Sequence, residues 1–204
     1  AVLLILAGFA TVFFSGLYLK WVALGSSFVF VSIPLIVANL KPYQMKRLEV
    51  FLDPDKDPFG SGYHIIQSKI AIGSGRIFGK GYGEGTQGQL NFLPAHHTDF
   101  IFSVFSEEWG FIGALLVLLL FLTLTLWSLA EVLKSKNRIS AILITGIVAI
   151  IISHVLINIG MTTGLMPVVG VPLPFFSYGG SSMLSMMFGV GLLLNIRMRR
   201  FEKN

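Results

Sequence analysis

Long apolar runs alternate with polar segments along the chain. Two runs cover residues 1–19 and 21–40, with Lys20 between them, and three more cover 100–133, 139–161 and 183–197. A helix of about 20 apolar residues crosses the ~30 Å hydrocarbon core of a bilayer. The pattern therefore predicts an all-α integral membrane protein, a polytopic bundle of about five transmembrane helices in a single domain.

Two segments interrupt these runs. Residues 41–98 carry charges and glycines throughout, which predicts a large loop outside the bilayer, with 63–72 as a short amphipathic helix on the membrane surface. The apolar positions expected on that helix are Ile65, Ile66, Ile70 and Ile72. Residues 162–182 are too apolar for a water-facing loop and too rich in Gly and Pro for a helix. We expect a re-entrant or interfacial segment there, buried in protein or lining a cavity.

Composition supports a membrane protein. Only 12% of the 204 residues are charged, against about 25% in soluble domains. The net charge of +5 is carried largely by short loops and the C-terminal tail, so it orients helices and does not indicate nucleic-acid binding. The chain has no cysteine, which excludes disulfides and thiolate metal sites.

The distribution of basic residues predicts the orientation. Lys20, the 134–138 connection and the tail after residue 196 all lie on one side of the predicted bundle. The positive-inside rule places that side in the cytoplasm. Segments 41–98 and 162–182 then share the outer face, where we expect the functional site.

Acidic residues mark the junction between the polar loop and the third apolar run. Asp99 is a candidate general base, activated by partial desolvation at the membrane edge, and the alternative role is a helix N-cap. Glu107 and Glu108 lie inside the run, where ionisable residues face a cavity or are solvated near the headgroups.

The glycine-rich stretch 73–81 does not match a nucleotide-binding loop. Gly81 follows Lys80 where a P-loop needs Ser or Thr, and Phe78 occupies the third glycine position of a dinucleotide fingerprint. Arg76 and Lys80 could hold a lipid-linked diphosphate, or could lie in a flexible turn near anionic headgroups.

The remaining polar residues give weaker signals. The histidines have no metal-binding spacing, and His154 and Asn158, four residues apart, predict an interhelical hydrogen bond. The serines around Gly179 and Gly180 fit close packing or a polar lining.

Several long motifs resemble one family. They are the stretch from Phe51 to Pro58, the stretch from Gly62 to Gly75, the stretch from Gln89 to Pro94, the motif from His97 to Phe102, and the signature from Pro167 to Ser182. These resemble the SEDS family (shape, elongation, division, sporulation). The Val-Val-Gly-Val-Pro-Leu-Pro form of the signature resembles its RodA branch more than the division branch, FtsW. The resemblance covers nearly the whole chain but only the C-terminal half of the family's ten-helix architecture. The sequence departs from the family at Ala95, where a Glu is common, and at Arg76, where a Gly is common.

The resemblance implies a peptidoglycan glycosyltransferase that polymerises lipid II during cell elongation and rod-shape maintenance. It implies an active site on the outer face of the bacterial cytoplasmic membrane, a class B penicillin-binding protein as partner within an elongation complex, and undecaprenyl diphosphate as leaving group. Asp99 corresponds to the family's essential acidic residue. We expect substrate-binding roles for Lys69, Arg76, Lys80, His97, Glu108, Ser177 and Ser181.

No resident cofactor is expected, although a divalent cation, Mg²⁺ or Mn²⁺, stays open. Two functions from other classes also stay open. A lipid II flippase would carry polar residues deep in several spans, whereas here they collect at one face. A non-catalytic scaffold for a penicillin-binding protein would tolerate Asp99→Asn.

Overall fold

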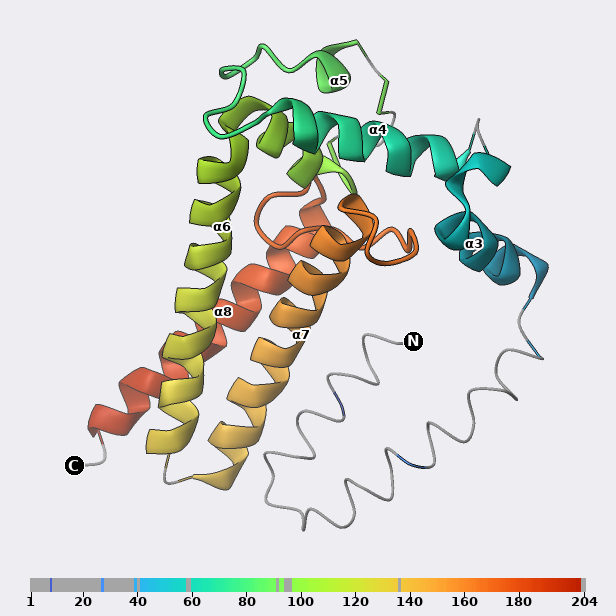
Figure 1. Ribbon diagram of the computed structural model, residues 1–204. Coiled ribbons are helices and arrows are strands. Elements are labelled where there is room, and N and C mark those ends of the chain that lie inside the picture. Colours follow the sequence, from blue (N-terminus) through green and yellow to red (C-terminus); the bar gives the residue numbers. More distant parts are fainter. Residues whose placement is uncertain are drawn as a thin grey trace. The chain divides into compact units, whose positions relative to one another are not determined.

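The computed structural model describes residues 41–57, 60–90, 92–93, 97–135 and 137–202, together with the single positions 8, 27 and 39. Its regular structure within these ranges is entirely helical. The predicted spans at 1–19 and 21–40 lie outside the described residues. The other predicted elements can be compared with the structure directly (Figure 1).

Four short helices occupy the segment that the sequence predicts as a loop, and three long helices follow it. The short ones are α3 (Pro42–Leu52), η1 (Pro54–Lys56), α4 (Ser61–Ser74) and α5 (Thr86–Gln89). The long ones are α6 (Ile101–Lys134), α7 (Arg138–Thr162) and α8 (Gly180–Glu202). Each long helix has the length and hydropathy needed to cross a membrane. Residues 163–179, between α7 and α8, form turns and irregular backbone, as their Gly and Pro content indicates.

The chain groups into two compact units, which we describe separately. In the first, residues 124–153 and 188–202 bring together the C-terminal parts of α6 and α8 and the N-terminal part of α7. Its buried core is formed by Ile144, Val148 and Leu193. Gly189 lets α8 approach α7, because a Cβ there would already touch Ile147. Arg197 of α8 stacks over the ring of Trp127 and lies 3.9 Å from the carboxylate of Glu131.

The second unit, residues 46–123 and 154–187, contains the predicted outer segments. Its helix α4 buries Gly62, Ile65, Ser68 and Ala71. Of the isoleucines expected on the apolar face, Ile65 is buried here, whereas Ile70 is 46% exposed.

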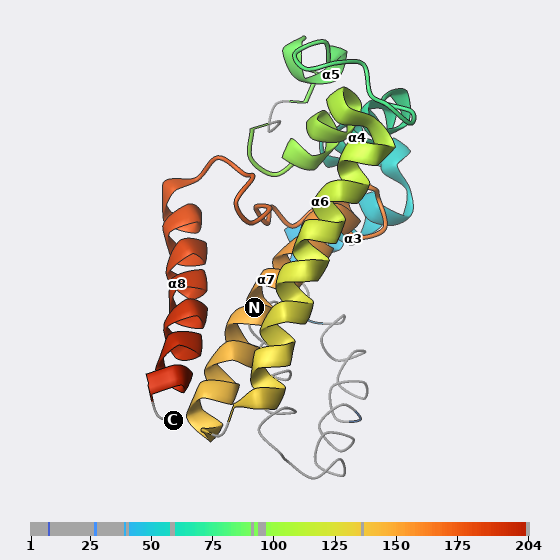
Figure 2. The same ribbon diagram turned by 90° about the vertical axis from the view of Figure 1, so that its left-hand side faces the viewer.

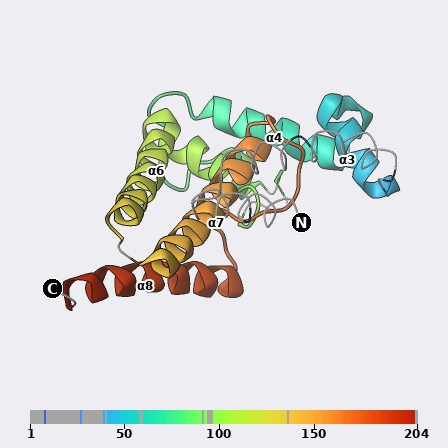
Figure 3. The same cartoon turned by 90° about the horizontal axis from the view of Figure 1, so that it is seen from below.

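Polar bonds explain the buried face of α4. The Ser68 hydroxyl donates to the carbonyl of Thr162 at 2.6 Å and lies 2.6 Å from the hydroxyl of Ser103. A buried serine therefore ties α4 to the end of α7 and the start of α6, and Figure 3 shows α7 reaching α4.

Helix α6 is broken at Gly110, whose φ of 66° and ψ of −164° are not helical. Such a break frees backbone groups that need other partners. The kink loop, residues 75–81, supplies them. The carbonyls of Glu107 and Glu108 accept from the N–H groups of Lys80 and Gly81, at 3.0 and 3.1 Å. Beyond the break, the N–H groups of Phe111 and Ile112 donate to the carbonyls of Arg76 and Ile77, at 2.9 and 3.1 Å.

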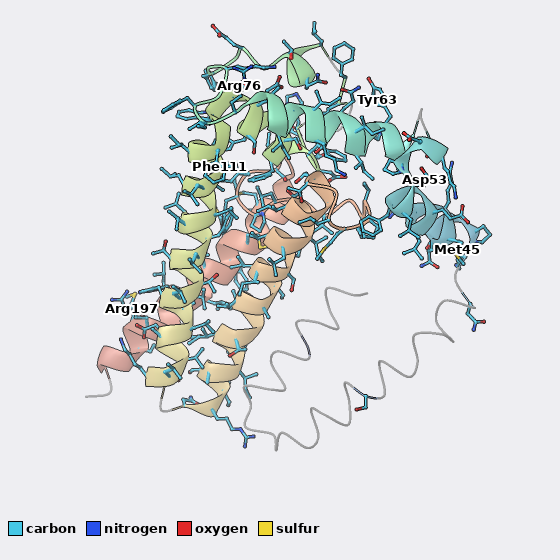
Figure 4. The ribbon with its side chains drawn as sticks, viewed as in Figure 1. Met45, Asp53, Tyr63, Arg76, Phe111 and Arg197 are labelled. Carbon is cyan, nitrogen blue, oxygen red and sulfur yellow. The ribbon has the colours of Figure 1, made fainter. Side chains whose placement is uncertain are left out.

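The kink loop thus closes the broken helix from outside. Figure 4 labels Arg76 and Phe111 at this level of α6, and Figure 2 shows α5 beside the same end of the helix. Glycine is required where the two backbones meet. A Cβ on Gly75 would overlap the carbonyl oxygen of Ser106, and one on Gly79 would overlap that of Glu108.

We predict that Gly110→Ala destabilises the protein strongly. The φ and ψ of Gly110 lie in a region that is essentially restricted to glycine, which costs another residue about 1–3 kcal/mol, and the new methyl would also overlap the backbone N of Gly79. The matched control is Gly73→Ala, in α4, where a Cβ meets nothing within 4 Å. It should change stability by less than about 1 kcal/mol. Thermal unfolding in detergent measures both, and equal melting temperatures for the two variants would contradict the structure of the kink.

Candidate active site

Asp99 lies in the turn before α6, and its backbone is held from outside the turn. The carbonyl of His97 accepts from the N–H of Tyr178 at 2.9 Å, and that of Thr98 accepts from the Ser177 hydroxyl at 2.7 Å. The carbonyl of Asp99 accepts from the Asn158 amide at 2.9 Å. Three consecutive carbonyls are therefore fixed by α7 and by segment 163–179. None of these bonds uses the carboxylate.

The carboxylate of Asp99 is partly buried and makes no hydrogen bond or ion pair within the described part of the chain. Burial without a compensating partner raises the pKa of this carboxyl above its ordinary value of 3.8. Gly170, with φ of 73°, passes close to it, since a Cβ there would lie 3.2 Å from Oδ2. An acid in this state can accept a proton from a neighbouring hydroxyl.

The N-cap alternative for Asp99 does not match the structure. Helix α6 begins at Ile101, and the carbonyl of Phe100 accepts from the N–H groups of Ser103 and Val104, so Phe100 occupies the N-cap position. Asp99 precedes the N-cap by one residue, so its side chain does not cap α6 and is available for another role.

An open pocket of about 420 Å³ adjoins the Asp99 turn. Its walls are largely apolar and come from the turn, the start of α6, segment 163–179 and the first turn of α8. Phe175, beside this wall, has a φ of 64°, which is strained for a non-glycine residue. Asp99 does not line the pocket, but its neighbours do. The lining residues are His97, Ile101, Phe176, Ser177, Tyr178, Gly179, Gly180 and Met183.

Glu107 forms a second polar centre, at the kink of α6. Its side chain is fully buried and lies 2.6 Å from the ammonium of Lys80. The same carboxylate accepts from the N–H and hydroxyl of Thr86, both at 2.9 Å, and from the N–H of Gln87 at 3.1 Å. Glu107 therefore anchors the kink loop and the start of α5, because both of its carboxylate oxygens accept hydrogen bonds from these segments.

The predicted site residues fall into two groups. His97 and Ser177 lie with Asp99, bound through the backbone contacts described above. The second group lies at the kink loop and consists of Arg76, Lys80 and Glu108. A backbone group of each makes one of the hydrogen bonds between the kink loop and α6. Lys69 is exposed on α4, with the end of its side chain against Gly164. Ser181 is exposed in the first turn of α8, where its carbonyl accepts from Ser185. Their roles in substrate binding stay predictions.

The described residues contain no group of three or more His, Asp or Glu side chains that could hold a metal ion. No step proposed below depends on a metal ion.

The structure gives Glu107 and Asn158 roles that the sequence does not indicate. Glu107 and Glu108 both lie in an apolar run, and only the structure separates the buried anchor from its half-buried neighbour. The sequence predicts that Asn158 bonds another helix, but its amide binds the backbone of the Asp99 turn. A lone amide inside an apolar run is the available signal for it.

Known proteins are similar to this chain over nearly its whole length. A family model described as "Cell cycle protein", which covers FtsW, RodA and SpoVE, matches residues 1–202. This chain belongs to the FtsW/RodA/SpoVE family. The resemblance to SEDS proteins is confirmed, and the chain is part of a multi-pass membrane protein of that family.

Two curated relatives and one solved structure illustrate the similarity. The peptidoglycan glycosyltransferase MrdB of Escherichia coli (strain K12) is 44% identical over 98% of this chain and 54% of its own length. The peptidoglycan glycosyltransferase RodA of Treponema pallidum (strain Nichols) is 44% identical over 90% of this chain and 43% of its own length. A solved chain, described under "Structural coordination of polymerization and crosslinking by a peptidoglycan synthase complex", matches with a TM-score of 0.74 and 32% identity. That match covers 97% of this chain and 55% of the solved chain. The chain thus spans about half the length of the relatives it matches, and the helical architecture of its described residues is that of the family.

We predict that Lys80→Met destabilises the kink of this family member. Breaking a buried ion pair costs about 3–5 kcal/mol. We expect about 1–3 kcal/mol, because Lys80 is 30% exposed and Glu107 keeps its other donors. The matched control is Lys46→Met, which breaks a 3.6 Å pair with Asp57 whose lysine is 66% exposed. Such pairs contribute at most about 1 kcal/mol. Thermal unfolding and proteolysis of residues 75–90 measure both, and equal stability of the two variants would contradict the anchoring role of Glu107.

Proposed function

We propose that the complete protein is a peptidoglycan glycosyltransferase that polymerises lipid II into glycan strands during cell elongation. Family membership supports this, since relatives 44% identical to the chain carry that enzyme name. The observation that carries the proposal is the state of Asp99, a desolvated carboxylate without a partner among the described residues, on a backbone fixed at three consecutive carbonyls.

The proposed reaction uses Asp99 as general base. The carboxylate takes the proton of the acceptor sugar hydroxyl of lipid II as that oxygen attacks the anomeric carbon of the growing strand. A glycosidic C–O bond forms, and the bond from the anomeric carbon to the diphosphate oxygen breaks. Undecaprenyl diphosphate leaves with the electron pair. Fixed anchors and an unpaired carboxylate are what such a base needs, because they set its direction and leave its lone pairs available.

The leaving diphosphate needs positive charge. Of the three basic candidates, Lys80 is neutralised by Glu107 at 2.6 Å. Lys69 is exposed and lies against Gly164, in the segment that also carries Gly170 next to the Asp99 carboxylate. We therefore favour Lys69 as the diphosphate-binding residue. Arg76, exposed on the kink loop, is a further candidate.

The proposal includes a location and a partner. We infer a site on the outer face of the bacterial cytoplasmic membrane, with the C-terminus in the cytoplasm, because the basic connection 134–138 and the basic tail share one side. A class B penicillin-binding protein is the proposed partner. The similar solved chain supports this choice, because it comes from a peptidoglycan synthase complex in which polymerisation and crosslinking are coordinated.

We predict that Asp99→Asn in the full-length protein lowers lipid II polymerisation by about 10²–10⁴-fold, the contribution of a general base. The melting temperature should not fall. The pKa of Asp99 is raised in the folded state, so the ionised carboxylate costs the fold stability at neutral pH, and the neutral amide does not incur that cost. The assay uses purified protein with its penicillin-binding partner, whose transpeptidase site is blocked, and measures strand length.

The matched control is Asp55→Asn, an exposed aspartate in η1, which should polymerise like the wild type. Wild-type turnover by a folded Asp99→Asn protein would reject the general-base role. A wild-type protein that assembles with its partner but makes no strands would reject the polymerase function itself.

A further inference from the structure

Asn158 lies near the end of α7, and its side chain is fully buried. Its amide nitrogen donates to the carbonyl of Asp99 at 2.9 Å and to the carbonyl of Val171 at 2.7 Å. Both partners are acceptors, so the nitrogen has to face them and both of its protons are used. One side chain thus bridges the turn before α6 and segment 163–179.

Both bridged carbonyls belong to backbone next to the candidate base. One belongs to Asp99 itself. The other belongs to the residue after Gly170, the glycine that passes close to the Asp99 carboxylate. The Asn158 amide therefore sets the spacing between the backbone that carries the carboxylate and the backbone that confines it.

The oxygen of the same amide argues against a role in packing alone. Oδ1 of Asn158 is buried and accepts no hydrogen bond from the described residues. A buried polar atom without a hydrogen-bond partner destabilises the fold, because it has lost its bonds to water. A leucine of similar shape would fill the position without that cost, so the useful part of Asn158 is its pair of donated bonds.

We propose that Asn158 is a positioning residue for Asp99: its two donated hydrogen bonds hold the Asp99 backbone at the distance from segment 163–179 that aims the carboxylate at the acceptor hydroxyl. This inference rests on the proposed polymerase function. Asn158 does not touch the substrate and acts only through Asp99.

The test compares three variants of the full-length protein with its partner. Asn158→Ala removes both bonds and leaves a cavity, and Asn158→Leu removes both bonds but keeps the volume. The control is Thr162→Val, one turn further along α7, which is equally buried and loses only bonds to carbonyls of its own helix. Lipid II polymerisation is measured as kcat and KM per folded protein, with hydrogen exchange of residues 97–103 as an independent readout.

We expect kcat to fall by about 10–100-fold in both Asn158 variants, the effect of misplacing a catalytic group by about 1 Å. KM should stay within about twofold, because the substrate's contacts are kept. Amides of residues 97–103 should exchange faster in both, whereas Thr162→Val should match the wild type.

Two results would overturn the proposal. If Asn158→Leu restores the wild-type kcat, Asn158 serves packing and not positioning. If KM rises while kcat is unchanged, the residue contributes to substrate binding. Asp99→Asn is assayed in parallel to separate this inference from the function it rests on. An inactive Asp99→Asn with an active Asn158→Leu rejects positioning alone, whereas an active Asp99→Asn rejects both.

Discussion

Backbone hydrogen bonding is the constraint on which this part of the protein depends. In and near a bilayer, every N–H and C=O that a helix does not use has to find another partner. Two departures from helical backbone bear on the site, one at Gly110 inside α6 and one over residues 163–179. At the first, the kink loop supplies donors and acceptors to the broken helix. At the second, Ser177, Tyr178 and Asn158 bind the carbonyls of the turn that carries Asp99.

Two acids eight positions apart have opposite environments as a result. Glu107 is fully buried and surrounded by donors, including an ammonium 2.6 Å away. Asp99 is partly buried and has no donor among the described residues. An acid whose charge is fully compensated is suited to holding structure, whereas a desolvated acid without a partner is suited to proton transfer. The two acids differ because the kink loop and α5 supply donors to the Glu107 carboxylate, whereas α7 and segment 163–179 bind only the backbone of the Asp99 turn.

Much of the architecture follows from the sequence, because the signals for it are local. Apolar runs longer than about 20 residues predict spans, and α6, α7 and α8 lie where the runs predict them. The Gly and Pro content of residues 162–182 likewise predicts the break between α7 and α8. Asp99 stands out because a carboxylate at the edge of an apolar run is unusual.

Long-range pairing could not be predicted in the same way. Nothing local indicates that the glycines at 75 and 79 are needed where the kink loop meets α6, and the stretch resembles a flexible turn. Choosing between Glu107 and Glu108 as the anchor requires knowing which one faces Lys80. The buried face of α4 includes Ser68 rather than Ile70, because a serine can bond the end of α7. The binding of Asn158 to the Asp99 turn likewise depends on the packing of α7 against a segment 59 positions away.

The most direct test of a desolvated, unpaired base is the pH dependence of lipid II polymerisation by the full-length protein with its partner. The base has to be ionised, and burial raises the pKa of Asp99 above 3.8. We therefore predict that kcat/KM falls on the acid side with a midpoint above 3.8, and that this acid limb is absent from the residual activity of Asp99→Asn. An acid limb that persists unchanged in Asp99→Asn would contradict the account, because another group would then be the base.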